Sequence, residues 1–401
     1  MQPTTRRDFW GQSAAALFAL GTSARFQPAT ADDAPRETTR DAAAAGRQQL
    51  RVDCKRILEA SIQAGEIPGA VLLVLHRQET ILHEAYGNRA ILPAREPMTT
   101  DTIFDLASLT KPIATATAVM QVWEQGLFQL NDPVAKHWPA FAASGKKEIT
   151  IEQLLVHTSG LIADNPERDY RDGREKAFAR IAALTPLNPP GMRFRYSDVN
   201  FLVLGDLVER LGRQPLDVWT RERIFQPLKM TDTGFRPDAK LIPRIAPTEP
   251  RNGMMVRGTV HDPRAALLGG VAGHAGLFGT AADLGRYARM LLGGGSLDGS
   301  RTLRAATLEQ FLTARTVPMG KRALGWDVDT GFSAPRGDRF PKGRGIGHTG
   351  FTGTSIWIDP PSETAVILLA SRLHPEGKGN ATPIRKQIAT RVADWALAQQ
   401  K

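Results

Sequence analysis

The sequence has one cysteine and no long apolar run, and each of these absences limits what the chain can be. Cys54 is the single cysteine in 401 residues, so no disulfide can form within the chain. We expect a buried, unreactive thiol, and export remains compatible with this because a large core needs no cross-link. No stretch approaches the roughly 18 uninterrupted apolar residues that a membrane span requires.

Motifs that define several hydrolase classes are also missing. The α/β-hydrolases carry their serine in a Gly-x-Ser-x-Gly pentapeptide, which does not occur here. The eight histidines include no H-E-x-x-H pair, so we expect no metal and no organic cofactor. His261 and Asp262 could bind a metal, but a capped turn suits that pair better. Ser159 and His157 lie two residues apart and point differently, so we expect a structural turn there.

Positive charge is in excess but is not concentrated in one run. The formal net charge is +10, and Arg6, Arg7 and Arg25 against Asp8 contribute +2 of it within residues 1–31, which leaves +8 for the rest. No basic-aromatic motif accompanies the charge, so nucleic acid is not an expected partner. Such a surface favours anionic surroundings, such as an envelope polymer or phospholipid headgroups.

The N-terminal segment has the order of a secretory signal. Arg6 and Arg7 precede a mild apolar run at 13–20, and small residues at 29–31 (ATA) follow. The paired arginines resemble a twin-arginine signal, so residues 1–31 predict an exported, periplasmic protein. The alternative is an amphipathic cytosolic helix.

The rest of the chain is predicted to be a short linker and one large domain. Residues 32–44 are polar and mixed in charge, which is typical of a linker. In residues 45–401 the strands lie at both ends, and they can form one sheet only if the ends meet in space. This predicts an α+β (α/β) fold, an antiparallel sheet flanked by terminal helices with a large, mainly helical inserted lobe. The sheet lobe is expected at about 45–105 and 300–401, the helical lobe at about 106–299, and the active site between them. The predicted helices are 50–64, 113–125, 200–211, 281–292 and 381–399, and the predicted strands are 70–76, 80–86, 355–358 and 365–369.

The strongest local signal for chemistry is residues 108–112 (SLTKP). Pro112 has no N–H and suits the first turn of a helix, which places Ser108 near the helix N-terminus. There the helix dipole lowers the cost of an alkoxide. Lys111 shares the face of Ser108, and a desolvated lysine with a lowered pKa could accept the serine proton. Ser108 is therefore a candidate nucleophile, although a lone S-x-x-K pattern is also common by chance.

A second cluster, residues 195–200 (RYSDVN), precedes a predicted helix. A tyrosine beside a cation can relay protons, so Tyr196 is a candidate acid–base group. The alternative is that Asp198 or Asn200 caps the helix and Tyr196 is a packed aromatic residue.

A third cluster, residues 347–353 (GHTGFTG), leads toward a strand. A strand edge flanked by glycines lets backbone N–H groups approach a ligand closely. One of these groups could complete an oxyanion hole with the N–H of Ser108. An ordinary glycine-rich turn is the alternative.

Together and in this order, the three clusters resemble the penicillin-recognising serine hydrolases. That family includes class C β-lactamases, low-molecular-mass D,D-peptidases and related esterases, and its motifs are S-x-x-K, Y-x-N and K-T-G. Here they are represented by residues 108–111, 196–198 and 348–350. The resemblance spans about 50–400 and implies a β-lactamase/transpeptidase-like fold. Phrases at 154–161, 269–278 and 324–326 also look like the family.

The resemblance also implies a role for each motif residue. Ser108 would be acylated, Lys111 would take its proton, and Tyr196 would move protons to the leaving group and from water. The N–H groups of Ser108 and Phe351 would form the oxyanion hole. The implied substrate-binding residues are Asp198, His348, Thr349, Gly350 and Phe351.

Two departures from the family pattern bear on the substrate. Asp198 stands where asparagine is usual and His348 where β-lactamases have lysine. Both favour peptidase or esterase work over efficient antibiotic hydrolysis. Because histidine has an unperturbed pKa near 6.5, we expect His348 to attract a substrate carboxylate less as the pH rises through this value.

The expected function is therefore hydrolysis through an acyl-enzyme in the cell envelope. The candidate substrates are a D-alanyl peptide, including peptidoglycan fragments, an ester, or with less support a β-lactam. The alternative is a non-catalytic penicillin-binding sensor or binder of cell-wall peptides. The presence of Ser108, Lys111 and Tyr196 together argues against a pure binder.

Overall fold

The first described element is a helix where a linker was predicted. The computed structural model describes the backbone of residues 34–399 and the side chains of residues 44–399, so the predicted signal 1–31 lies outside it. Two compact units divide the chain, residues 1–44 and 45–401. Helix α1 (Ala34–Gln63) already begins in the first unit, so the segment predicted as a linker is helical from Ala34 onward. The four alanines at 42–45 explain the difference, because alanine has the highest helix propensity.

The second unit is built on a nine-stranded antiparallel sheet. Its central strand β1 (Gly69–His76) pairs with β2 (Glu79–Ala90) on one side and with β16 (Thr364–Ala370) on the other. In the second pair Ala70 lies opposite Ala370. The predicted meeting of the two strand-bearing ends is confirmed. The order continues through β15 (Ser355–Asp359), β14 (Ile346–Thr349), β13 (Asp327–Asp329), β12 (Gly320–Arg322) and β11 (Arg315–Val317), and β3 (Glu96–Pro97) lies beside β2.

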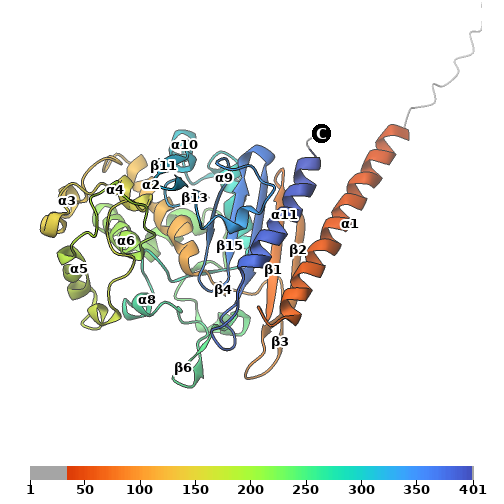
Figure 1. Ribbon diagram of the computed structural model, residues 1–401, viewed down its shortest axis with the longest axis horizontal. Helices are drawn as coiled ribbons and strands as arrows, with labels where there is room; N and C mark the ends of the chain where they lie inside the picture. Colours follow the sequence, from red (N-terminus) through yellow and green to blue (C-terminus); the bar gives the residue numbers. More distant parts are fainter. Residues whose placement is uncertain (1–33, 400–401) are drawn as a thin grey trace, which may run out of the picture. The chain divides into compact units, whose positions relative to one another are not determined.

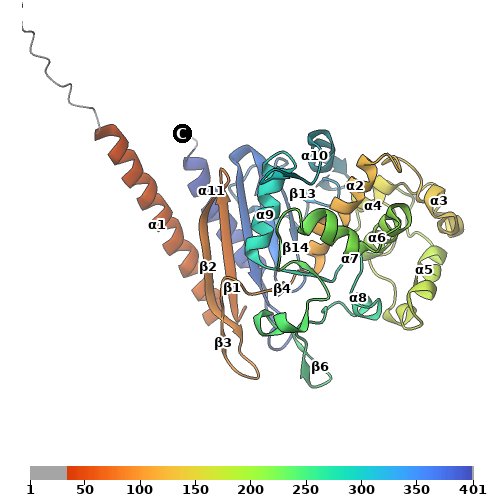
Figure 2. The same ribbon diagram turned by 180° about the vertical axis from the view of Figure 1, so that it is seen from behind.

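Both faces of this sheet are covered, which explains why β1 is apolar from Ala70 to Leu75. All eight of its residues are buried, since alternate side chains enter two different cores. One core packs against α1 and the C-terminal helix α11 (Thr382–Ala398), which lies along the sheet in Figure 1. The other packs against α9 (Ala281–Leu292), seen on the opposite face in Figure 2. Cys54 is fully buried in the first core, and burial raises the pKa of its thiol to about 12, as expected of an unreactive cysteine.

The chain between β3 and β11 carries most of the described helices and forms the lobe beside the sheet, apart from α9, which packs on the sheet. The predicted helix 281–292 is α9, and the predicted helix 200–211 is α6 (Asp198–Gly212), which Ser197 rather than Asp198 or Asn200 caps. None of the described helices is both long and apolar enough to cross a membrane. The other helices are α2 (Thr117–Glu124), α3 (Val134–His137), α4 (Ile151–Leu155), α5 (Arg174–Ala183), α7 (Leu216–Thr220), α8 (Pro263–Leu267) and α10 (Ala305–Leu312).

Three small sheets complete the unit, and one of them fixes the chain just before Ser108. Strand β4 (Phe104–Asp105) pairs with β8 (Leu277–Gly279), which also pairs with β5 (Gly234–Phe235). The Thr352 hydroxyl donates to the Asp105 carbonyl at 2.7 Å, which ties the end of β4 to the loop after β14. The start of the helical lobe is thereby held against the edge of the large sheet. The remaining pairs are β6 (Pro250–Arg251) with β7 (Met254–Met255) and β9 (Ser296–Leu297) with β10 (Ser300–Arg301).

Candidate active site

Ser108 lies in a short turn that joins β4 to a helix. Residues Ala107–Leu109 form a 3-10 turn, and the wider π-helical turn Lys111–Ala116 leads into α2, so Ser108 does lie at a helix start. Ala107 has a φ of 46°, an unfavourable value for a residue with a Cβ. The Asp105 carboxylate accepts the Ala107 N–H at 2.8 Å and the His261 N–H at 2.7 Å. These contacts hold the strained turn and fix the position of Ser108.

Lys111 is fully buried beneath Ser108 and makes three polar contacts. Its Nζ donates to Ser108 Oγ at 3.0 Å and to the His274 carbonyl at 2.9 Å, and it lies 2.6 Å from Asp198 Oδ1. An ammonium group has three N–H donors and no acceptor, so this environment matches the protonated form. Spacing correctly predicted the contact with Ser108.

The charge state of Lys111 differs from the sequence prediction. Burial lowers its pKa, as expected, but the negative charge of Asp198 and the contact with Tyr196 outweigh burial and raise the pKa above its ordinary value. The prediction of a lowered pKa is therefore wrong. The physical reason is the carboxylate that replaces a neutral asparagine amide at position 198.

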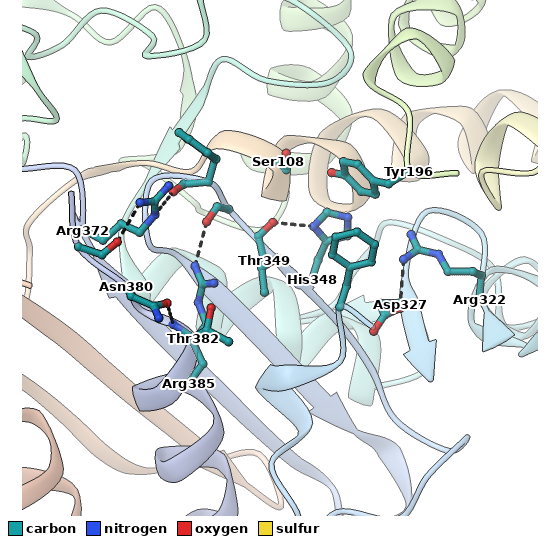
Figure 3. Close-up of a pocket in the computed structure, with 14 residues that line it drawn as sticks. Ser108, Tyr196, Arg322, Asp327, His348, Thr349, Arg372, Asn380, Thr382 and Arg385 are labelled. Atoms are coloured by element: carbon teal, nitrogen blue, oxygen red, sulfur yellow. Dashed lines mark hydrogen bonds and ion pairs between the residues drawn. The ribbon is translucent and has the colours of Figure 1, made fainter. Parts of the chain in front are cut away.

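Tyr196 is buried beside Ser108 and Lys111, and its hydroxyl points toward Ser108 (Figure 3). Its ring lies 4.6 Å from the His157 ring, and Lys111 Nζ is 5.0 Å from the centre of the tyrosine ring. Burial raises the pKa of Tyr196, although Lys111 and Ser108 oppose this, so the group is a neutral phenol at physiological pH. A neutral phenol can donate a proton to a leaving group.

The second serine–histidine pair has a structural role, as predicted. Ser159 Oγ donates to Asn200 Oδ1 at 2.7 Å and accepts the Leu161 N–H at 3.1 Å. His157 Nδ1 accepts the Ser197 N–H at 3.0 Å. The sequence did not reveal that the His157 ring supports Tyr196.

The glycine-rich segment after β14 borders Ser108. A Cβ added to Gly350 would lie 2.1 Å from Thr354 Oγ1 and 2.7 Å from the Leu106 carbonyl oxygen, so only glycine fits there. Arg385 Nη2 donates to the Gly350 carbonyl at 2.8 Å. In a trans peptide the N–H points opposite to the carbonyl. The Phe351 N–H is therefore directed away from Arg385.

His348 is buried and neutral, which contradicts the expectation of a titrating anchor. Its Nδ1 lies 3.0 Å from the Thr349 carbonyl. Burial lowers the pKa of His348 well below its ordinary value, and the cations Arg322 and Lys111 lower it further. A neutral imidazole attracts no carboxylate by charge. The predicted loss of substrate attraction between about pH 5.5 and 8 is therefore wrong.

A pocket of about 400 Å³ opens at these residues (Figure 3). Of the predicted site residues, it is lined by Ser108, Tyr196, His348, Thr349, Gly350 and Phe351. Lys111 and Asp198 do not line the pocket. Lys111 contacts the pocket residue Ser108, and Asp198 contacts Lys111.

Sequence reasoning missed the charges of this pocket. Of its described lining residues, three carry guanidinium groups, Arg322, Arg372 and Arg385, and one carries a carboxylate, Asp327. Arg322 and Asp327 form an ion pair at 3.2 Å, and within the described chain Arg322 Nε and Nη2 have no hydrogen-bond partner. Figure 3 shows Arg322 on one side of Ser108 and Arg372 on the other. An arginine that belongs to no motif cannot be recognised as a site residue from the sequence, because only the tertiary structure brings it to the pocket.

One cluster of possible metal ligands lies next to Lys111. Asp198, Asp262 and His274 offer ligand atoms within 4.8 Å of one another. However, Lys111 already supplies a cation to Asp198, and His274 Nε2 lies 2.9 Å from Asp262 Oδ1. Asp262 also caps α8 by accepting the Ala265 N–H at 2.8 Å, which confirms the predicted capped turn. The contacts within this cluster are those of ion pairs and a helix cap.

Comparison with known proteins agrees with this fold. The chain belongs to the beta-lactamase family, whose model matches residues 54–390, and it is a serine hydrolase. Among its relatives is a Salmonella typhimurium protein named "Putative D-alanyl-D-alanine carboxypeptidase", 32% identical over 354 residues, which cover 79% of this chain and 81% of the relative.

Solved structures share the fold. A penicillin-binding protein homologue from Caulobacter crescentus matches with a TM-score of 0.70 and 22% identity, over 86% of this chain and 97% of that one. EstCE1, described as a hydrolase with promiscuous acyltransferase activity, matches with a TM-score of 0.69 and 23% identity, over 86% of this chain and 99% of that one. The predicted β-lactamase/transpeptidase-like fold is confirmed.

Proposed function

We propose that the protein is a D-alanyl peptide hydrolase that cleaves substrates with a free terminal carboxylate through an acyl-enzyme at Ser108. The observation that carries this proposal is the charge of the pocket, which is lined by three guanidinium groups and one carboxylate. Because Asp327 pairs with Arg322, the charges of Arg372 and Arg385 remain in excess. The name of the Salmonella relative supports the same substrate class.

The charge argument favours peptides over neutral esters. Guanidinium groups bind carboxylates through paired, charge-assisted hydrogen bonds. A buried cation without a counter-ion is costly, and a substrate carboxylate would relieve that cost. A neutral ester would leave the excess charge unmatched, and would therefore gain nothing from these arginines.

The proposed reaction follows from the order of groups around Ser108. Ser108 Oγ attacks the scissile carbonyl carbon, and the electron pair moves to the carbonyl oxygen, which the N–H groups of Ser108 and Phe351 stabilise. The serine proton is taken up through Lys111. As the carbonyl re-forms, the bond to the amine breaks and Tyr196 gives a proton to the departing amine. The proton from Ser108 then returns through Lys111 to Tyr196. Water then attacks the acyl-enzyme, returns a proton to Ser108 and releases the acid.

The test compares two substrates that differ only in charge. An N-acylated D-alanyl-D-alanine should be cleaved with a kcat/KM at least about tenfold above that of its C-terminal amide. Arg372→Met removes one of the two guanidinium groups whose charge is in excess. It should reduce this preference and leave hydrolysis of p-nitrophenyl acetate within about threefold of the parent value. Equal cleavage of both substrates would instead assign the protein to neutral esters.

Labelling and mass measurement test the nucleophile and the turnover. Ser108→Ala should fold yet lose labelling by a serine-reactive phosphonate, whereas Ser159→Ala should label normally. Label that remains on Ser108→Ala, or that maps to Ser159, would contradict the assignment. An acyl adduct that forms on the parent protein and never clears would favour the non-catalytic sensor.

We also propose that the enzyme works in the cell envelope after export. The support is the order of residues 1–31 and the excess positive charge of the remaining chain. Changing Arg6 and Arg7 together to lysine should leave the precursor inside the cell. Unchanged export would point to the general secretory route or to no signal.

A further inference from the structure

Asp198 lies closer to Lys111 than any other acceptor that contacts its Nζ in the described chain. The separation from Asp198 Oδ1 is 2.6 Å, against 2.9 Å to the His274 carbonyl and 3.0 Å to Ser108 Oγ. Lys111 is fully buried, so no water replaces these partners. Lys111 Nζ donates two hydrogen bonds and forms an ion pair with Asp198, and an ammonium group has no lone pair for the proton of Ser108.

This arrangement sets a condition on the reaction. Lys111 can accept the proton of Ser108 only if it first or simultaneously gives one away. Of its three partners, Ser108 is the proton source and the His274 carbonyl is a very weak base. Asp198 is the partner able to take a proton, and an asparagine in its place could not.

We propose that Asp198 accepts a proton from Lys111 as Lys111 takes the proton of Ser108, so that Asp198 is a positioning residue for proton transfer rather than a substrate ligand. This inference rests on the proposed role of Ser108. In the step, the Ser108 O–H bond breaks and a new Lys111 N–H bond forms, while a second Lys111 N–H bond breaks and an Asp198 O–H bond forms. Ser108 Oγ bonds to the carbonyl carbon, and the negative charge passes from Asp198 to the oxyanion.

The surroundings of Asp198 are suited to hold that proton. A carboxylate oxygen of Asp198 lies within 4.8 Å of polar atoms of Asp262 and His274. Burial raises the pKa of the nearby Asp164, and the charge of Asp198 raises it further. A proton that arrives at Asp198 reduces the repulsion within this group of carboxylates. The titratable and charged groups that surround the pair are Tyr196, His157, His348, Asp164, Asp262, His274 and Arg264.

Substrate binding would promote the transfer. The proton shift makes Asp198 a neutral acid and leaves Lys111 an ammonium group. The shift becomes easier when water is displaced, because a carboxylate that loses solvation is protonated more readily. The side chain of Asp198 is 19% exposed, so substrate in the pocket can still remove solvent from it.

The pH dependence of acylation tests the proposal. We expect Asp198→Asn to lower kcat/KM for p-nitrophenyl acetate at pH 7 about 100-fold. Activity should recover only as the pH rises, because Lys111 must then lose its own proton to solvent. The ascending limb of the profile should therefore move to higher pH. Asp198→Glu keeps a carboxylate and should keep the limb of the parent protein, and Asp172→Asn, an exposed carboxylate paired with Arg180, is the matched control.

Two results would overturn the proposal. If Asp198 only raised the pKa of Lys111, Asp198→Asn would move the limb to lower pH and increase activity at pH 7. If Asp198 only packed the site, activity would fall equally at every pH. Should Asp198→Asn fail to fold, an alkaline shift in Asp198→Glu would also contradict the proposal. Failure of the underlying function is separate, since it would appear as full activity in Ser108→Ala.

Discussion

Arg385 Nη2 and the carbonyl oxygen of Gly350 lie 2.8 Å apart, and this contact sets the direction of the peptide between Gly350 and Phe351. The same Nη2 donates to the Thr354 carbonyl at 2.9 Å, so one guanidinium holds both ends of the turn. Arg385 is 8% exposed and comes from α11, far along the chain. The C-terminal helix thereby orients a backbone N–H in the segment that lines the same pocket as Ser108.

Replacement of Arg385 should therefore impair catalysis more than neutral-substrate binding. Loss of a whole oxyanion donor costs about 100-fold or more in kcat, and misorientation of one should cost about tenfold. We expect Arg385→Met to lower kcat for p-nitrophenyl acetate by about that amount with little change in KM. Lys386→Met, on the exposed neighbour that pairs with Asp338, is the matched control and should leave both constants unchanged. A kcat equal to that of the parent protein would show that the turn holds its own direction.

The hydroxyl of Tyr196 should be needed for turnover. Tyr196→Phe keeps the ring against His157 and removes only the proton donor, so turnover should fall about 10²–10⁴-fold. Steady-state kinetics on a peptide substrate measure this. Tyr170→Phe, which removes a buried hydroxyl bonded to Asn165, serves as the comparison. A loss below about threefold in Tyr196→Phe would make that residue a packing group.

Discrimination between charged and neutral substrates should not change with pH. Burial lowers the pKa of His348 well below its ordinary value, so the imidazole stays neutral from about pH 5.5 to 8. The ratio of kcat/KM for a carboxylate-bearing peptide to that for a neutral ester should be constant over this range. Parallel pH profiles for the two substrates measure it. A ratio that declines as the pH rises would mean that His348 does become protonated in the complex.

A fall in pH should remove the stabilisation that the charged Glu96 side chain gives to the folded protein. Two nitrogens of Arg257 bind its carboxylate, each at 2.7 Å, and with Arg89 they lower the pKa of Glu96 to about 2. A folded pKa below the unfolded value of about 4.3 stabilises the protein above that value, and the gain disappears as the pH falls toward 2. Glu96→Gln should cost about 1–2 kcal/mol at pH 7 after allowance for partial exposure.

Denaturant unfolding at several pH values measures this cost. The difference between Glu96→Gln and the parent protein should shrink below about pH 4. A double-mutant cycle with Arg257→Met should assign most of the cost to the pair. A difference that is the same at pH 3 and pH 7 would mean that the Glu96 charge contributes nothing.

Much of the fold could be predicted because its signals are local. The helix predicted over 281–292 is found at Ala281–Leu292, since an apolar face of helical period and a capping threonine mark it in the sequence. Likewise β1 is a continuous apolar run, which only a strand buried on both faces requires. The helical start of α1 was missed because its polar composition suggested a linker, while its alanines favoured a helix.

The motif residues of the site could be predicted from the sequence, but the charge states of Lys111 and His348 could not. Ser108 and Lys111 are close in sequence, so their contact follows from helical spacing. Whether Lys111 is charged depends on Asp198, and whether His348 is charged depends on burial and Arg322. Both conditions involve residues that only tertiary structure brings together. Spacing alone carries no information about the local dielectric or about a distant counter-ion.

The pairing of β1 with β16 has a consequence for biosynthesis. Residues 69–76 pair with residues 364–370, which are synthesised much later. The sheet therefore cannot be completed until nearly the whole domain has left the ribosome. Until then a strand that is apolar from Ala70 to Leu75 has an unpaired edge, and such edges promote aggregation. Folding is therefore post-translational for the sheet. A nascent chain stalled before residue 364 should depend on chaperones to remain soluble.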